Sequence, residues 1–205
     1  MNIIINLLFI FILGIFVIVY NLNKLYYNYG NAINVPRELL YNVLKPGIYE
    51  GVSTTSGDVL SLMDGCLYKN GQKSIHRLYI SKTLNGIKFE NIIKVHDSVS
   101  GDFLHTLKRD GEFTYMHKQN DNLYKLSRNY IDDKLVGASY GYVTDITNNS
   151  ITANLHGVWH ISSKEYHNVS NVMRRLDNNH LESQLIHKYL GFSDILVDQK
   201  YTMLN

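Results

Sequence analysis

Histidine is the residue type in this chain that most invites catalytic or metal chemistry, and the chain has nine. His156 and His160 form the closest pair, in a segment with the composition of a strand. Residues four apart in a strand are separated by about 13 Å, too far to share one metal ion. His180 and His187 would lie two turns apart on a helix, which is also too far. We expect surface histidines, with neither a metal site nor a cofactor.

The other polar residues do not form a recognisable catalytic group. An enzyme site needs an acid, a base and often a nucleophile within reach of one another. Asp132, Asp133 and Asp145 lie in segments typical of turns, where aspartate accepts hydrogen bonds from the backbone. Gly137 and Gly141 precede no helix, so they form no phosphate loop and instead indicate relief of curvature or crowding in a sheet. We expect no enzymatic activity and no catalytic residues.

Arg128 is the polar residue that best suits a binding role. If residues 132–134 form a three-residue turn, Arg128 faces the inside of a sheet among tyrosines and could hold the carboxylate of a fatty acid or a similar ligand. A register shift of one residue would instead turn Arg128 outward. Of the two orientations, we favour the outward one. The aromatic residues expected to line the same site are Tyr124, Tyr130, Tyr140, Tyr142 and Trp159.

Short strands would position these residues. Runs of β-branched and aromatic residues, separated by Gly, Asn and Asp, follow both prolines of the chain and are typical of an antiparallel meander. Asn85-Gly86 is a favourable hairpin turn. The expected strands are residues 48–53, 59–68, 74–83, 87–96, 103–108, 113–117, 123–130, 136–147, 150–161 and 195–203.

A second hairpin is expected at Asn148-Asn149. If Thr147 pairs with Ser150, the register places Ile146 opposite Ile151, Thr144 opposite Ala153, Tyr142 opposite Leu155, Tyr140 opposite Gly157 and Ala138 opposite Trp159. Because side chains alternate across a strand, these residues would share one buried face, and the opposite face would be polar. One buried and one wet face over long strands indicates a barrel or a strongly curled sheet.

Closing the sheet would remove exposed edges, so we expect a mainly β fold, an antiparallel up-and-down barrel of eight to ten strands. Residues 169–189 contain apolar residues at helical spacing, interrupted at Asn178-Asn179. They predict one or two short helices, or a helix and a loop, that cross the barrel before its last strand.

The N-terminal residues predict a membrane anchor. Ile3 to Tyr20 is an apolar run interrupted only by Asn6, and eighteen helical residues rise about 27 Å, the thickness of a bilayer core. A cleaved signal peptide is disfavoured because no basic n-region or small-residue cleavage site is present. We expect a single-pass signal anchor at residues 1–22, a linker at 23–46 and the barrel at 47–205. One lysine after the run leaves the membrane orientation open.

Charge and cysteine content exclude some partners. Twenty basic and eighteen acidic residues are interspersed along the chain, so no basic stripe indicates nucleic-acid binding. The lone cysteine, Cys66, cannot form an internal disulfide and is expected to be a small core or strand residue.

Four features follow one another in the second half of the chain: Tyr124, Asp132-Asp133, the glycine-spaced strand at 135–141, and Lys188-Tyr189-Leu190-Gly191-Phe192. In order and approximate spacing, they are similar to segments of an uncharacterised bacterial family of membrane-anchored lipocalin-like domains. The resemblance implies a calycin-type barrel on the periplasmic or extracytoplasmic side of a membrane. The chain departs from that family in lacking an N-terminal lipoprotein cysteine and an aspartate-tryptophan element after the return strand.

Two functions follow as hypotheses. The first is a membrane-tethered, lipocalin-like barrel that binds an apolar or amphiphilic small molecule or assists envelope lipid handling. The alternative is a non-catalytic structural or protein-interaction module at a membrane, cellular or viral, whose barrel is filled by its own side chains. Sixteen tyrosines suit either, because tyrosine lines pockets and covers interfaces.

Overall fold

The computed structural model describes residues 11–15, 32–56, 71–115, 122–158, 166–188 and 195–204. The chain divides into two compact units, Met1–Ala32 and Ile33–Asn205. In the first unit, residues 11–15 are helical and exposed. Within the described ranges, no helix combines the length and the apolar character needed to cross a bilayer. The expected anchor at residues 1–22 lies largely outside these ranges and stays a prediction.

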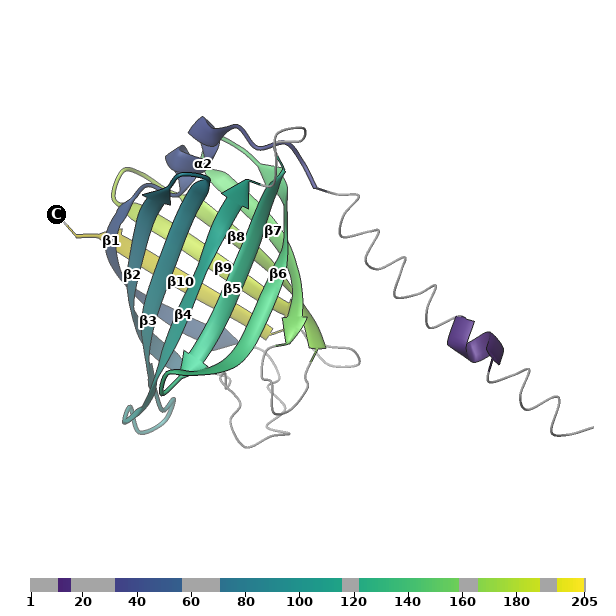
Figure 1. Ribbon diagram of the computed structural model, residues 1–205. Helices are drawn as coiled ribbons and strands as arrows, with labels where there is room; N and C mark the ends of the chain where they lie inside the picture. Colours follow the sequence, from purple (N-terminus) through teal and green to yellow (C-terminus); the bar gives the residue numbers. More distant parts are fainter. Residues whose placement is uncertain are drawn as a thin grey trace, which may run out of the picture. The chain divides into compact units, whose positions relative to one another are not determined.

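The second unit is a closed barrel of ten antiparallel strands (Figure 1). Each strand pairs with its neighbours in the chain, and the first and last strands pair to complete the ring, so the expected up-and-down barrel is confirmed. The expected strand at 59–68 lies outside the described residues. The strands are β1 (Gly47–Ser56), β2 (Lys73–Thr83), β3 (Gly86–His96), β4 (Phe103–Tyr115), β5 (Leu123–Ile131), β6 (Lys134–Ile146), β7 (Ser150–Val158), β8 (Tyr166–Arg175), β9 (His180–Lys188) and β10 (Ile195–Met203).

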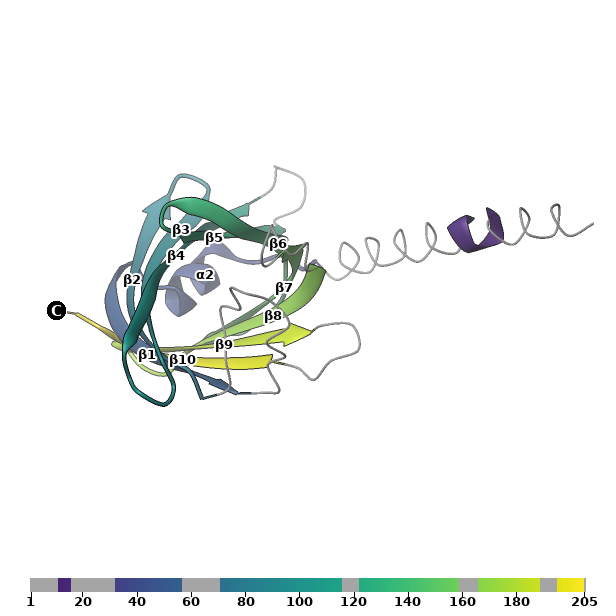
Figure 2. The same cartoon turned by 90° about the horizontal axis from the view of Figure 1, so that it is seen from below.

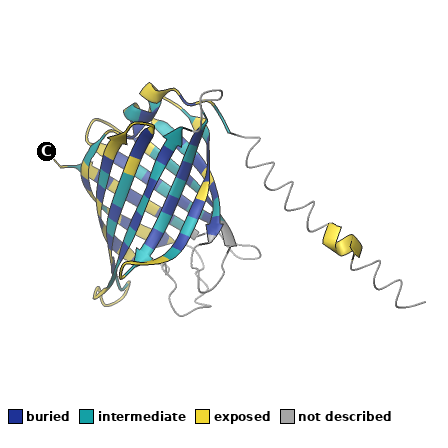
Figure 3. Cartoon of the chain, in the orientation of Figure 1, coloured by how far each residue is buried: buried dark blue, intermediate teal, exposed yellow. Residues whose placement is uncertain are grey.

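Burial alternates from residue to residue along the strands (Figure 3). In β2, His76 and Leu78 are buried, whereas Ile75 and Arg77 between and beside them are exposed. Since successive side chains of a strand point to opposite faces, one set fills the barrel and the other faces outward. The interior is therefore built from every second residue of each strand.

Helix α2 (Arg37–Val43) closes one end of the barrel. Seen along the barrel, it lies within the ring of strands (Figure 2), and Leu40, Val43 and the following Leu44 are almost fully buried. Arg175 of β8 holds the helix C-terminus, because its Nε donates a hydrogen bond of 3.1 Å to the carbonyl of Val43. Residues 33–46, expected to belong to the linker, are thus part of the barrel's compact unit.

The expected hairpin between β2 and β3 is confirmed, with its turn one residue earlier than Asn85-Gly86. Leu84 and Asn85 make the turn, and Gly86 is already paired with Thr83. Gly86 has a φ of +149°, and a Cβ there would lie 1.9 Å from the carbonyl oxygen of Phe113. Glycine is required at this position because the next strand approaches its backbone so closely.

The expected helices in residues 169–189 are wrong, because β8 and β9 form a hairpin there. Asp177 makes the turn, since its Oδ1 accepts hydrogen bonds from the backbone nitrogens of Asn179 and His180. Polar residues at inward positions conceal the strand alternation, and the remaining apolar residues then show helical spacing. The inward residues of the two strands are Val169, Asn171, Met173, Arg175, Leu181, Ser183, Leu185 and His187.

The register expected for the β6–β7 hairpin holds only near its turn. Ile146 faces Ile151 as predicted, but a β-bulge at Thr144 shifts the pairing, so that Val143 faces Ala153 and Tyr142 faces Asn154. The extra residue turns the rest of β6 over, which places Val143 inside and Tyr142 outside. The predicted inward face is correct for β7 and reversed for β6 beyond the bulge.

Candidate functional site

A band of polar side chains crosses the interior of the barrel. Its members come from eight strands, each at an inward position flanked by outward residues. They are His76, Asn91, Arg109, Lys125, Ser127, Ser139, Asn171, Ser183, His187 and Gln199, all buried. Among the buried residues that the structure describes, three are cationic and none is Asp or Glu. The band therefore carries positive charge in a region shielded from water.

Lys125 is the most unusual member of this band, with 4% of its surface exposed. Its cross-strand neighbours are Phe113 on β4 and Gly141 on β6. The Nζ atom lies 4.9 Å from the centre of the Phe113 ring and 5.6 Å from that of Phe89. It donates a hydrogen bond to Oδ1 of Asn171. Burial, aided by the positive charge of Arg109, lowers the pKa of Lys125 to about 7.

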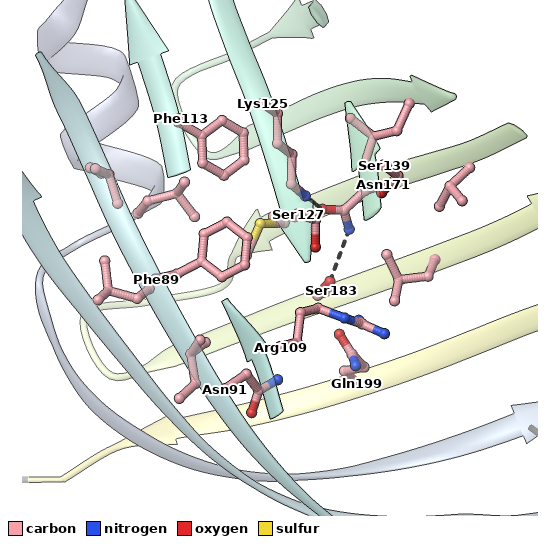
Figure 4. A pocket seen from close by; sticks show the side chains of 18 of the residues that line it. Phe89, Asn91, Arg109, Phe113, Lys125, Ser127, Ser139, Asn171, Ser183 and Gln199 are labelled. Carbon is pink, nitrogen blue, oxygen red and sulfur yellow. Dashed lines mark hydrogen bonds between the residues drawn. The ribbon is translucent and has the colours of Figure 1, made fainter. Parts of the chain in front are cut away.

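Arg109 and Asn171 fix the geometry around the lysine. Arg109 donates from Nε to Oδ1 of Asn129 at 2.8 Å. Asn171 donates from Nδ2 to Oγ of Ser183 at 3.1 Å and to the carbonyl of Gln184 at 3.2 Å. These two bonds turn the amide oxygen of Asn171 towards Lys125. Figure 4 shows Lys125 and Arg109 on opposite sides of a group formed by Ser127, Asn171 and Ser183, with Gln199 next to Arg109.

His76 belongs to a separate network on the β1–β3 side of the interior. Its Nε2 lies 2.7 Å from Oγ of Ser53, and its Nδ1 accepts a hydrogen bond of 3.1 Å from Nδ2 of Asn91. The same Asn91 nitrogen donates to the hydroxyl of Tyr201 at 3.0 Å. Burial, with a smaller contribution from the charge of Arg109, lowers the pKa of His76 to about 3. The ring is therefore neutral at physiological pH and acts as part of the wall.

A cavity of about 50 Å³ lies beside the polar band. Such a space holds roughly three to five water-sized groups. One part of its wall is apolar, formed by Leu78, Ile80, Ile87, Leu155, Val169 and Leu185, and another part carries Lys125, Arg109, Asn91, Asn171, Ser183 and Gln199. The cavity thus offers separate surfaces to an apolar and a polar group.

The arginine that the sequence suggested for binding lies outside the barrel. Arg128 alternates with the buried Ser127 and Asn129, and 39% of its side chain is exposed. Its Nε forms an ion pair of 2.7 Å with Oδ1 of Asp110, and this hydrogen bond raises the pKa of the guanidinium further. The inward orientation of Arg128 is wrong, although β5 pairs with β6 as that orientation required, with Tyr124 opposite Tyr142. The β-bulge at Thr144 turns this face of both strands away from the interior.

The tyrosines expected to accompany Arg128 also face outward. Tyr124 packs against Tyr142 with ring centres 5.7 Å apart and against Tyr140 at 6.4 Å. Tyr130 alternates with the buried Asn129, on the same side as Arg128. Trp159 lies outside the described residues. The structure thus brings Tyr124, Tyr140 and Tyr142 together on the outer face of the sheet, away from the cavity.

The interior cations were missed because both faces of β5 mix polar and apolar residues. Lys125, Ser127 and Asn129 alternate with Tyr124, Leu126, Arg128 and Tyr130, and the second set is the more apolar. Periodicity alone then assigns the wrong face to the core. The sequence of the neighbouring strand β4 could have revealed an interior cation. Leu107 and Phe113 are apolar and share a face with Arg109, so burying that face also buries the arginine.

The described residues contain no group of three or more His, Cys, Asp or Glu side chains arranged to hold a metal ion. No protein-family model and no curated protein matches the chain. The ten-stranded closed barrel is compatible with a lipocalin-like fold and with the binding of a small molecule inside it.

Proposed function

We propose that this protein is a non-catalytic barrel that binds a small amphiphilic molecule in its interior, tethered to a membrane by its N-terminal apolar segment. The supporting observation is the cavity, which has an apolar wall on one part and a polar band on another. An apolar pocket with a few convergent polar groups is the usual form of a small-molecule site. The absence of a recognisable catalytic group in the sequence leads us to a carrier or sensor in place of an enzyme.

The size of the cavity defines the ligand more closely. Sites for drug-sized ligands measure roughly 300–1,000 Å³, whereas this cavity measures about 50 Å³. A short-chain molecule fits this space better than a long-chain lipid, which would require displacement of side chains such as Met173 and Phe89. The proposed ligand is therefore short, with one apolar and one polar end.

The membrane tether is proposed from the sequence. Residues 3–20 have the length and composition of a spanning helix. The similarity of the second half to membrane-anchored lipocalin-like domains supports the same arrangement, with the barrel on the extracytoplasmic side and a role in handling envelope molecules.

Native mass spectrometry of the full chain released from detergent micelles tests this function. We expect one of two results. Either the protein carries a small adduct that short-chain acids and alcohols such as hexanoate and hexanol displace, or it is empty and takes up these compounds. Val169→Phe should abolish this binding, since Val169 lines the cavity and a larger ring would fill it. Val172→Phe is the matched control, because Val172 lies on the outward face of the same strand.

Two results would contradict the proposal. A folded protein that carries no adduct and takes up neither hexanoate nor hexanol favours a barrel filled by its own side chains. Equal loss of binding in the Val169 and Val172 variants would place the ligand outside the barrel.

A further inference from the structure

We propose that the polar end of the ligand is an anion, a carboxylate or a phosphate, which binds inside the barrel against the ammonium of Lys125, with the guanidinium of Arg109 on its other side. This inference rests on the proposed function, because it names the chemical class of the molecule that the cavity takes. Lys125 thus takes the place of the outward-facing Arg128 as the residue proposed to bind the acidic group.

The position of Lys125 is the first argument. A buried cation is strongly unfavourable unless an opposite charge replaces its solvent. The ammonium contacts the neutral amide of Asn171 and the rings of Phe89 and Phe113. No carboxylate occurs among the buried residues of the described ranges. An anionic ligand would supply the opposite charge that the wall around Lys125 lacks.

The second argument is the convergence of a second cation on the same space. Arg109 comes from the neighbouring strand β4 and lines the same cavity. Its charge acts on Lys125, where it lowers the pKa of the ammonium. An anion between the two cations would attract both and would screen their mutual repulsion. A site for a neutral ligand would gain nothing from this arrangement.

The third argument is the neutral polar groups between the cations. Hydroxyls of Ser127 and Ser183 lie between Lys125 and Arg109, and the amide of Gln199 lies next to Arg109 (Figure 4). Hydroxyl and amide groups donate hydrogen bonds to the oxygens of a carboxylate or a phosphate. The apolar part of the wall, from Leu155, Val169 and Leu185, then accommodates a short chain attached to the anion.

Calorimetric titration of the full chain with hexanoate, hexanol and hexylammonium tests the inference, with empty micelles as blank. We expect hexanoate to bind roughly ten- to a hundredfold more tightly than hexanol, as a charge-assisted contact requires, and hexylammonium not to bind. Lys125→Met and Arg109→Leu should remove this preference for the acid, so that hexanoate binds no more tightly than hexanol. Lys88→Met and Arg128→Leu are matched controls at outward positions and should bind like the unchanged protein.

Proton uptake gives a second readout that a purely structural lysine would not change. At about pH 8, above the folded-state pKa, binding of an anion should protonate Lys125. Titrations in two buffers of different ionisation enthalpy should then show proton uptake with hexanoate and none with hexanol. Lys125→Met should abolish the uptake.

The outcomes separate the two proposals. Equal affinity for hexanoate and hexanol, or an acid preference that survives in Lys125→Met, overturns the anion site and leaves the proposed function intact. Failure of all three probes to bind the folded protein overturns the proposed function. Inorganic phosphate that binds without any hexanol binding, and that is lost in Lys125→Met, supports the anion site and shows a free anion as its ligand.

Discussion

Lys125 and His76 make the ligand-free barrel sensitive to acid. Both are bases whose pKa is lower in the folded protein, about 7 and about 3, than the ordinary values of 10.5 for lysine and 6.5 for histidine. At a pH between the folded and the unfolded pKa of either group, that group binds more protons in the unfolded chain than in the folded protein. The free energy of unfolding therefore rises with pH across each window and falls on acidification.

Lys125→Met should remove the upper part of this pH dependence. Between about pH 7.5 and 9.5, the unchanged protein should gain as much as about 2 kcal/mol of stability relative to the variant, at up to about 1.4 kcal/mol per pH unit. Urea denaturation at both pH values measures the difference. The same slope in both proteins would show that the lysine is charged, and therefore solvated or paired, in the fold.

At the scale of elements, Arg175 connects the barrel wall to the helix that closes it. It donates to the carbonyl of Val43 and, at 3.0 Å, to the hydroxyl of Tyr49. Arg175→Met should therefore loosen α2 and lower stability by about 1–3 kcal/mol. Hydrogen exchange should become faster at the amide of Leu44, which bonds to the carbonyl of Leu40. Arg174→Met, at an exposed position of the same strand, should change neither quantity.

The bulge in β6 makes a second prediction about an element. Cysteines at Tyr142 and Asn154, in a Cys66→Ser background, are directly opposed in the observed register and should cross-link. Cysteines at Tyr142 and Leu155 point to opposite faces of the sheet and should not. Preferential cross-linking of the second pair would show that β6 and β7 pair without a bulge.

Strand positions could be predicted from the sequence more reliably than the direction of their side chains. Turn residues such as Asn85 and Asn149 and runs of β-branched residues mark strand ends, and most expected strands appear within a few residues. The direction of the side chains depends on which of the two alternating sets of a strand is buried. Here the buried sets include Lys125, Asn171 and Ser183, whereas polar residues of these types are mostly exposed in proteins. Asn171 and Ser183 also made β8 and β9 look helical, whereas the β-bulge at Thr144 reversed the expected face of β6.

At the scale of the whole molecule, ring closure leaves none of the ten described strands with a free edge. β1 pairs with β2 on one side and β10 on the other, over eight residue pairs each. We expect backbone amides of β1 and β10 to exchange as slowly as those of β5, which native-state hydrogen exchange measures. Faster exchange confined to β1 and β10 would show that the barrel opens at this seam.

The seam also has a consequence for how the protein is made. Tyr49 pairs with Met203, so strands from the two ends of the barrel sequence must meet. A ribosome releases β1 early and β10 last, and until then β1 has an unsatisfied edge beside a row of growing hairpins. Contacts between residues so distant in sequence close slowly. For most of its synthesis, the nascent chain therefore carries a strand whose unpaired backbone groups can pair with another chain. A cell that makes this protein must prevent such strands of neighbouring copies from pairing with one another.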